Sequence, residues 1–220
     1  MPPKETIKKM LPRFVREAIN LHNRIRHQGL ISKRNSEIIK ELLRGAMPIK
    51  LDLGAGDRKM EGWTSVDRNG KCVLNLDLAA PMPFPDNSVS IIYSSHVLEH
   101  FNISELFALL NECKRILKVG GIFSAAVPNA RIYIEAYQSP KDFKPEFFCR
   151  YKPAYNFNSK IDYINHMAYM DGHHKYMFDE GNLVVILKKA GFKQVRLRGF
   201  DKSLDLVARD YQSIYVQAVK

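Results

Sequence analysis

The chain has 220 residues, of which 45% are hydrophobic and 26% are charged, a balance typical of one soluble domain with or without a short appendage. This composition excludes a disordered chain, a collagen and a coiled coil, and no apolar run approaches the roughly 18 residues that a membrane span needs. The N-terminus lacks a signal-peptide pattern, and Cys72, Cys113 and Cys149 are too widely spaced for a disulfide framework or a zinc site. We therefore expect a cytoplasmic protein with reduced thiols.

Positive charge is concentrated at the N-terminal end. The whole chain has 34 Lys and Arg against 23 Asp and Glu, and residues 1–50 alone have 12 against 4. We expect residues 1–48 to form a basic helical extension and residues 49–220 to form the main domain. Two interpretations of the extension stay open. It is either a structural helix packed on the edge of the sheet with a solvated basic face, or an element that attaches the protein to an anionic membrane surface or a polyanion, in which case the protein is peripheral to a membrane.

Two helices are predicted in the extension. An apolar stripe at helical spacing predicts the first, which we expect to end at Gly29; its members are Phe14, Ala18, Leu21 and Ile25. The second is expected to start at an N-cap, Ser36, and to stop at Gly45.

After residue 48, short apolar segments alternate with helical ones. Strands are predicted at 49–53, 64–66, 72–76, 89–93, 122–127, 195–197 and 214–219, with helices at 104–117 and 182–190. This alternation predicts an α/β fold with a doubly wound, mostly parallel, seven-stranded sheet. Residues 138–175 break the rhythm, and we expect them to form a lid or substrate-binding insertion over the open end of the sheet.

Three features stand where the first three predicted strands end, the edge at which α/β sheets bind ligands. They are the turn Asp52-Leu-Gly54-Ala-Gly56, the carboxylate Asp67 and the pair Asp77-Leu78. Glycines permit a close approach of ligand to backbone. A carboxylate after the second strand suits a ribose diol, and an acid beside an apolar side chain suits an adenine. Together they predict an adenosine ligand.

The type of adenosine ligand follows from what the glycine turn lacks. Lys59 occupies the third glycine position of a dinucleotide fingerprint, and the chain contains no Walker loop. No cradle for a polyphosphate is evident. An adenosine without phosphates indicates S-adenosylmethionine.

A set of motifs then carries a family resemblance. In order, they are Leu-Asp-Leu-Gly-Ala-Gly, Ser-Val-Asp67, Asp77-Leu, Met-Pro-Phe-Pro-Asp-Asn-Ser-Val, Ser-His-Val-Leu-Glu-His100, Ile-Leu-Lys-Val-Gly-Gly and Lys-Lys-Ala-Gly-Phe192. Over about residues 49–220 the chain resembles class I S-adenosylmethionine-dependent methyltransferases, with their Rossmann-like sheet. It looks most like the compact group associated with surface polysaccharide and glycoconjugate synthesis.

The resemblance implies roles for eight residues in binding S-adenosylmethionine. Gly54 and Gly56 would flank the methionine moiety, and Asp52 would reach its amino end. Asp67 would bind the ribose diol. The remaining four would face the adenine or lie beneath the methionine, near the methyl group: Asp77 and Leu78, then Ser95 and His96.

The glycine turn departs from the wider family. Asp57 stands where a third glycine is common, and only residues 57–66 separate Gly56 from Asp67. This is too short for a crossover helix and a strand, so we expect the first helix to be short or absent and the loop to lie over the cofactor.

Methylation of a hydroxyl requires an acceptor for its proton, and histidine is the natural base near neutral pH. The candidate catalytic residues are His174, His173 and His100. His100 has an alternative role as a cap or buried contact of the following helix. Of the adjacent His173 and His174, one is favoured over both, because neighbouring side chains in an extended segment point in opposite directions.

No metal is expected. His166, Asp171, His173 and His174 offer ligands that could converge on a divalent ion, but their spacing matches no standard pattern.

The expected function is methylation of a small-molecule or glycan acceptor, first a sugar hydroxyl and second a quinone or lipid-like ring. Two alternatives remain open, namely a non-catalytic cofactor-binding module and a nucleic-acid methyltransferase. The basic extension favours the second, whereas the chain has Val127-Pro128-Asn129-Ala130 in place of the Asn-Pro-Pro-Tyr motif used on base amines.

Overall fold

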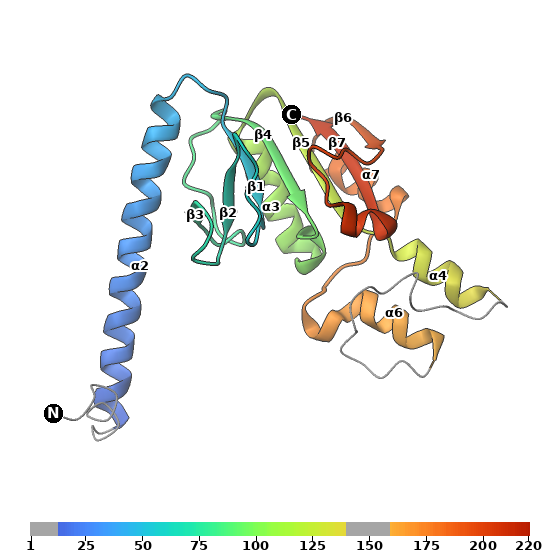
Figure 1. The fold of residues 1–220 in the computed structure, drawn as a ribbon, viewed down its shortest axis with the longest axis horizontal. Helices are drawn as coiled ribbons and strands as arrows, with labels where there is room; N and C mark the ends of the chain where they lie inside the picture. The colour runs from blue at the N-terminus through green and yellow to red at the C-terminus, as the bar shows by residue number, and fades with distance from the viewer. Residues whose placement is uncertain (1–12, 140–158) are drawn as a thin grey trace. The chain divides into compact units, whose positions relative to one another are not determined.

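The computed structural model describes residues 13–139 and 159–220 (Figure 1). The chain divides into two compact units, residues 1–45 and residues 46–220. The predicted insertion at 138–175 falls partly outside the described residues. Among the described residues, no helix has both the length and the apolar character needed to cross a bilayer.

The first unit contains one long helix where two were predicted. Helix α2 runs without interruption over Arg13–Arg44. The prediction of a break at Gly29 is wrong, because this glycine takes no positive φ and a glycine inside a helix costs only about 1 kcal/mol relative to alanine. Ser36 is likewise no cap, since its hydroxyl donates to the carbonyl of Ser32 within the helix. The end at Gly45 is confirmed. For the predicted apolar stripe the structure describes the backbone, and its side chains are outside the described part.

The second unit is built on a seven-stranded sheet. The strands are β1 (Lys50–Leu53), β2 (Thr64–Asp67), β3 (Leu74–Asn75), β4 (Val89–Ser95), β5 (Leu117–Pro128), β6 (Lys193–Arg198) and β7 (Ser213–Val219). Their order is β3-β2-β1-β4-β5-β7-β6, parallel from β3 to β5 and antiparallel at both pairings of β7. The predicted α/β class and mostly parallel sheet are confirmed.

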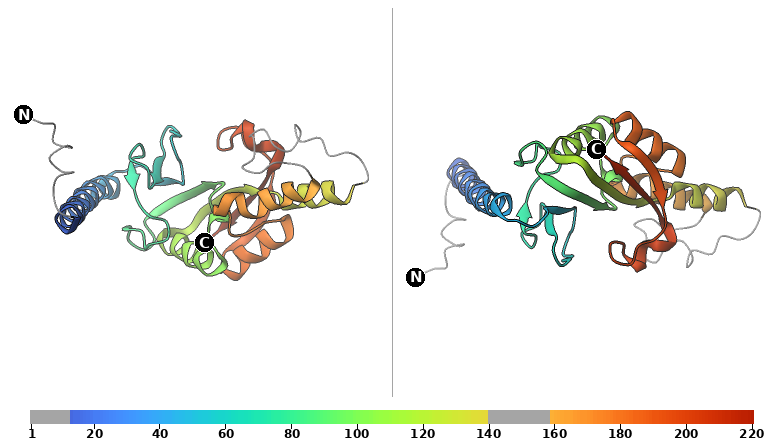
Figure 2. Two further views of the ribbon diagram at one scale, coloured as in Figure 1. Left: turned by 90° about the horizontal axis from the view of Figure 1, so that it is seen from below. Right: turned by 90° about the horizontal axis from the view of Figure 1, so that it is seen from above.

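Helices cover the sheet unevenly. They are α3 (Ile103–Ile116), α4 (Ala130–Gln138), α6 (Lys160–Tyr169) and α7 (Glu180–Lys189), with 3₁₀ turns η1 (Leu98–His100), η2 (Met170–Gly172) and η3 (Val207–Gln212). Figure 2 shows α3 and α7 on the same face of the sheet. α4 and α6 pack on each other through four buried side chains, Ala130, Tyr133, Tyr163 and Met167.

The connections after β1 and β2 contain no helix. Turns and bends occupy 54–63 and 68–73, as the short spacing before Asp67 predicts for the first of them. The strands still contribute apolar side chains that are fully buried in the core, including Leu51, Val66 and Phe123. Without crossover helices, loops form the walls of the site at the carboxyl ends of these strands.

Candidate active site

Two cavities lie at the carboxyl ends of β1, β2 and β4. The larger, of about 350 Å³, is lined by Gly54, Asp67, Arg68, Leu76, Asp77, Leu78, Ala79, His96, Val97, His100, Phe101, Glu105 and Lys175. The smaller, of about 280 Å³, is lined by Asp52, Gly54, Ala55, Gly56, Asp57, Arg58, Ser95, Leu206 and Arg209. Gly54 lines both. All eight predicted cofactor residues line one cavity or the other.

The glycine turn has the backbone that the sequence predicts. Gly54 and Gly56 have φ of +66° and +58°, a backbone region that residues with a Cβ rarely adopt. A Cβ on Gly54 would lie 2.2 Å from Cγ2 of Val97, whereas one on Gly56 would meet no atom within 4 Å. Gly54 is therefore required both by its conformation and by the close packing of the turn against the end of β4.

Asp67 forms part of the wall of the larger cavity. Its Oδ2 accepts a hydrogen bond from the amide of Gly56 at 2.9 Å, and its Oδ1 accepts one from the amide of Asn69 at 3.1 Å. Each oxygen keeps a second lone pair. These two amides orient the half-buried carboxylate and leave it able to accept hydrogen bonds from a ligand diol.

The third strand end supplies a polar and an apolar group side by side. Asp77 is half exposed, and its Oδ1 accepts a hydrogen bond from the amide of Ala79. Leu78 is buried and lines the same cavity as Val97 and Phe101. This end of the larger cavity is suited to a flat aromatic ring with a polar edge.

Asp52 is held by an arginine for which the sequence predicts no role. Arg58 donates from Nε to Oδ2 and from Nη2 to Oδ1 of Asp52, at 3.0 and 2.8 Å, and from Nη1 to the carbonyl of Leu204. Burial raises the pKa of Asp52, although the hydrogen bonds and charge of Arg58 act in the opposite direction. The short loop after β1 is thereby fixed to the C-terminal segment at the wall of the smaller cavity.

Ser95 is the last residue of β4 and lines the smaller cavity, and His96 follows it and lines the larger. His96 has a positive φ of 54°, a strained conformation of the kind found at functional sites. Its Nε2 donates to the hydroxyl of Ser213, which itself donates to the carbonyl of Arg209. Burial lowers the pKa of His96 to about 3, helped by the charge of Arg209, so its ring is neutral at physiological pH.

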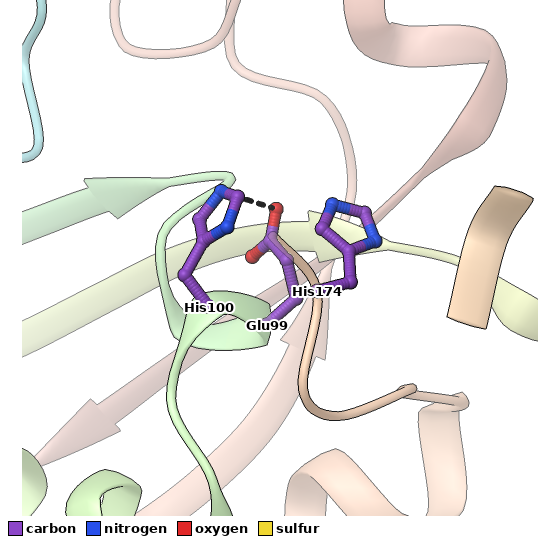
Figure 3. A group of neighbouring side chains, drawn as sticks. All are labelled: Glu99, His100 and His174. Atoms are coloured by element: carbon purple, nitrogen blue, oxygen red, sulfur yellow. Dashed lines mark ion pairs between the residues drawn. The ribbon is translucent and has the colours of Figure 1, made fainter. Parts of the chain in front are cut away.

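Two of the three predicted catalytic histidines come together beside a buried glutamate. One ligand atom from each of Glu99, His100 and His174 lies within 4.8 Å of the others (Figure 3). The rings of His100 and His174 meet edge to face with centroids 5.1 Å apart. His173 is exposed, and its carbonyl accepts a hydrogen bond from Nδ1 of His100. The structure therefore gathers His100 and His174 and leaves the His173 imidazole outside the cluster.

Comparison with known proteins finds a match over the segment that contains β1 to β4. The model of a methyltransferase domain family matches residues 51–125, which contain the glycine turn, Asp67, Asp77 and the end of β4. The matched segment is a methyltransferase domain. The enzyme's cofactor is S-adenosylmethionine. No curated protein matches the chain by sequence.

Several solved structures resemble this methyltransferase. A SAM-dependent methyltransferase from Archaeoglobus fulgidus is 18% identical with a TM-score of 0.49, and the match covers 87% of this chain and 94% of that one. A SAM-dependent methyltransferase from Thermotoga maritima, described as a possible histamine N-methyltransferase, is 14% identical with a TM-score of 0.48, over 91% and 97% of the two chains. One from Mesorhizobium loti is 15% identical with a TM-score of 0.47, over 84% and 96%.

Sequence reasoning assigns no role to several residues at or beside the two cavities, among them Arg58, Glu99 and Arg209. A signal for Glu99 exists in the sequence, because His96-Val-Leu-Glu99-His100 has the H-x-x-E-H spacing of one class of zinc peptidases. Arg58 and Arg209 carry no such signal, since their contacts depend on loops whose paths only the folded chain defines.

Proposed function

We propose that the cofactor lies across both cavities, with its adenosine in the larger and its methionine in the smaller. Asp67 would accept hydrogen bonds from the ribose hydroxyls, and Asp77 with Leu78 would contact the adenine. Gly54 and Gly56 would flank the methionine, and Asp52, held by Arg58, would act at its amino end. The two lining sets, which share Gly54, support this division.

We further propose that the acceptor is a hydroxyl, of a sugar or a related ring, and that the enzyme acts in surface polysaccharide or glycoconjugate synthesis. When bound, S-adenosylmethionine supplies an activated methyl group that passes to the acceptor oxygen as the hydroxyl proton is lost. The observation that supports a hydroxyl is the histidine cluster at the wall of the larger cavity, because a hydroxyl, unlike a neutral amine, must be activated before it attacks.

The protonation of these rings follows from their hydrogen bonds. Nδ1 of His100 must donate to the carbonyl of His173, at 2.9 Å, so in the neutral ring Nε2 carries the lone pair. His100 also lines the larger cavity, and its side chain is 39% exposed, so an acceptor can reach it. Burial lowers the pKa of His174 to about 4, which makes it a weaker base than an ordinary imidazole. His100 is therefore the proposed proton acceptor, with His174 packed against it.

A panel of acceptors tests this proposal through release of S-adenosylhomocysteine. It should contain sugars and glycolipids, quinols, primary amines and short RNAs. We expect release with a hydroxyl acceptor, and we expect His100→Ala to lower kcat about 10²- to 10⁴-fold with a much smaller change in the Kd of the cofactor. Release with RNA or amines alone, or an unaltered kcat in the variant, would overturn the proposal.

A further inference from the structure

Glu99 is an unusual carboxylate that the methyl transfer described above does not use. It lies in η1, directly after β4, and is 2% exposed. Neither carboxylate oxygen accepts a hydrogen bond from any residue of the described ranges 13–139 and 159–220. A buried carboxylate without partners is costly to keep, so its presence indicates that something else satisfies it.

Imidazole nitrogens face this carboxylate from two segments far apart in the sequence. Nδ1 of His96 lies 3.8 Å and Nε2 of His100 lies 4.0 Å from Oε1 of Glu99, both too far for a hydrogen bond; Figure 3 shows His100 beside the carboxylate. His174 approaches from the segment after η2, where the amides of Lys175 and Tyr176 donate to the backbone carbonyl of Glu99. These two hydrogen bonds join the segment after η2 to η1, so the backbone holds His174 close to Glu99 and His100.

Both rings are oriented in the manner of metal ligands. Nδ1 of His100 donates to the carbonyl of His173, and Nδ1 of His174 donates to the carbonyl of Met167 at 2.7 Å. Each neutral ring therefore has Nε2 free of a proton. Ligating histidines typically donate their other nitrogen to a carbonyl or a carboxylate, which fixes the tautomer and the ring orientation.

We propose that Glu99, His100 and His174 bind a divalent transition-metal ion, of which zinc is the best match to the ligand set. Two histidines and one glutamate are the protein ligands of one class of catalytic zinc sites, which keep a further position open. The three ligand atoms lie within 4.8 Å of one another, and zinc bonds of roughly 2.0–2.2 Å would require them to move closer together. This site differs from the four possible metal ligands considered from the sequence, His166, Asp171, His173 and His174, and shares only His174 with them.

The inference rests on the proposed methyl transfer to a hydroxyl and changes the role of His100 in it from proton acceptor to metal ligand. A metal ion beside His100 would polarise the acceptor hydroxyl and lower its pKa, in place of direct proton removal by the imidazole. The O–H bond breaks with its proton passing to solvent, and the oxygen's electron pair forms the bond to the methyl carbon. The electron pair of the broken S–C bond stays on sulfur.

Direct metal binding tests the site without cofactor or acceptor. The full chain, freed of metal by a chelator and dialysed, is titrated with Zn²⁺ in a calorimeter and with Co²⁺ in a spectrophotometer. We expect one ion per chain and the visible absorption of a low-coordinate Co²⁺ site. Glu99→Gln, which keeps the side chain's shape, and His100→Ala should each weaken binding about 10- to 100-fold or more. The exposed His173→Ala is the matched control and should bind as the unaltered chain does.

The outcomes separate this inference from the proposed function. Absence of stoichiometric binding, or binding that Glu99→Gln and His100→Ala leave unchanged while circular dichroism shows both folded, would overturn the metal site. Binding by a chain that methylates no hydroxyl would support the site and contradict the proposed function. Full turnover of a hydroxyl acceptor by the metal-free chain would support the proposed function and overturn the metal's role in it.

Discussion

The backbone amide of Gly56 donates a hydrogen bond of 2.9 Å to Oδ2 of Asp67, which joins the turn after β1 to the carboxylate that ends β2. Gly56 has a positive φ in this turn. The other carboxylate oxygen of Asp67, Oδ1, accepts a hydrogen bond from the amide of Asn69. The carboxylate is therefore oriented before any ligand arrives, which lowers the cost of binding a diol.

Replacement of Asp67 by alanine should weaken S-adenosylmethionine binding about tenfold or more. The ribose hydroxyls would lose their acceptor on burial, at a cost of roughly 1–3 kcal/mol. Titration calorimetry measures the change. Glu61→Ala removes an exposed carboxylate from the neighbouring loop and should leave the affinity unaltered. An Asp67→Ala chain with unchanged affinity would show that another group binds the ribose.

Gly54→Ala should lower the free energy of unfolding more than Gly56→Ala. Both positions have positive φ, so each alanine adds roughly 1–2 kcal/mol of backbone strain. At Gly54 the new methyl also lies 2.2 Å from Cγ2 of Val97, and such overpacking adds roughly 1–3 kcal/mol. Urea unfolding compares the two variants.

A second substitution separates the two contributions at Gly54. Val97→Ala removes the methyl groups that crowd the turn, so in the Gly54→Ala background it should cost less than it does alone. Additive effects of the two substitutions, or equal losses at Gly54 and Gly56, would contradict the role assigned to this contact.

The sheet could be predicted because its strands are short apolar segments between glycine or acidic turns, a local pattern. The positions of Gly54, Asp67 and Leu78 at one edge then follow from parallel topology alone. The break wrongly predicted at Gly29 shows where local signals fail, since a glycine permits a turn without requiring one. Arg58 and Glu99 could not be placed, because their environments depend on Leu204 and on the segment after His173, both more than 70 residues away in the sequence.

Asp205→Ala should destabilise the chain far more than Tyr93→Phe. Asp205 is buried and accepts two hydrogen bonds from Arg198, at 2.6 and 2.8 Å, and one from the hydroxyl of Tyr93. Its removal leaves the largely buried guanidinium of Arg198 without its paired carboxylate, at a cost of roughly 3–5 kcal/mol. Loss of the Tyr93 hydroxyl alone should cost about 1 kcal/mol. Urea unfolding measures both, and similar losses would mean that the ion pair contributes no more than a neutral hydrogen bond.

The basic face of α2 should attach the full chain to anionic membranes at low salt. Its exposed cations in the described part are Lys33, Arg34, Lys40 and Arg44. Each basic side chain near an anionic surface contributes roughly 1 kcal/mol, so replacing all four by glutamine should weaken binding to phosphatidylserine vesicles about 100-fold or more. Added salt should also weaken binding of the unaltered chain to the vesicles, because the Debye length is only about 10 Å at 0.1 M.

The matched control replaces four exposed lysines of the second unit: Lys118, Lys188, Lys189 and Lys193. Vesicle sedimentation gives the affinities, and calorimetry should show unaltered S-adenosylmethionine binding in the α2 variant if residues 1–48 are separate from the catalytic domain. Equal losses in the two sets would indicate attraction by net charge alone, and binding of RNA in preference to vesicles would identify a polyanion as the partner.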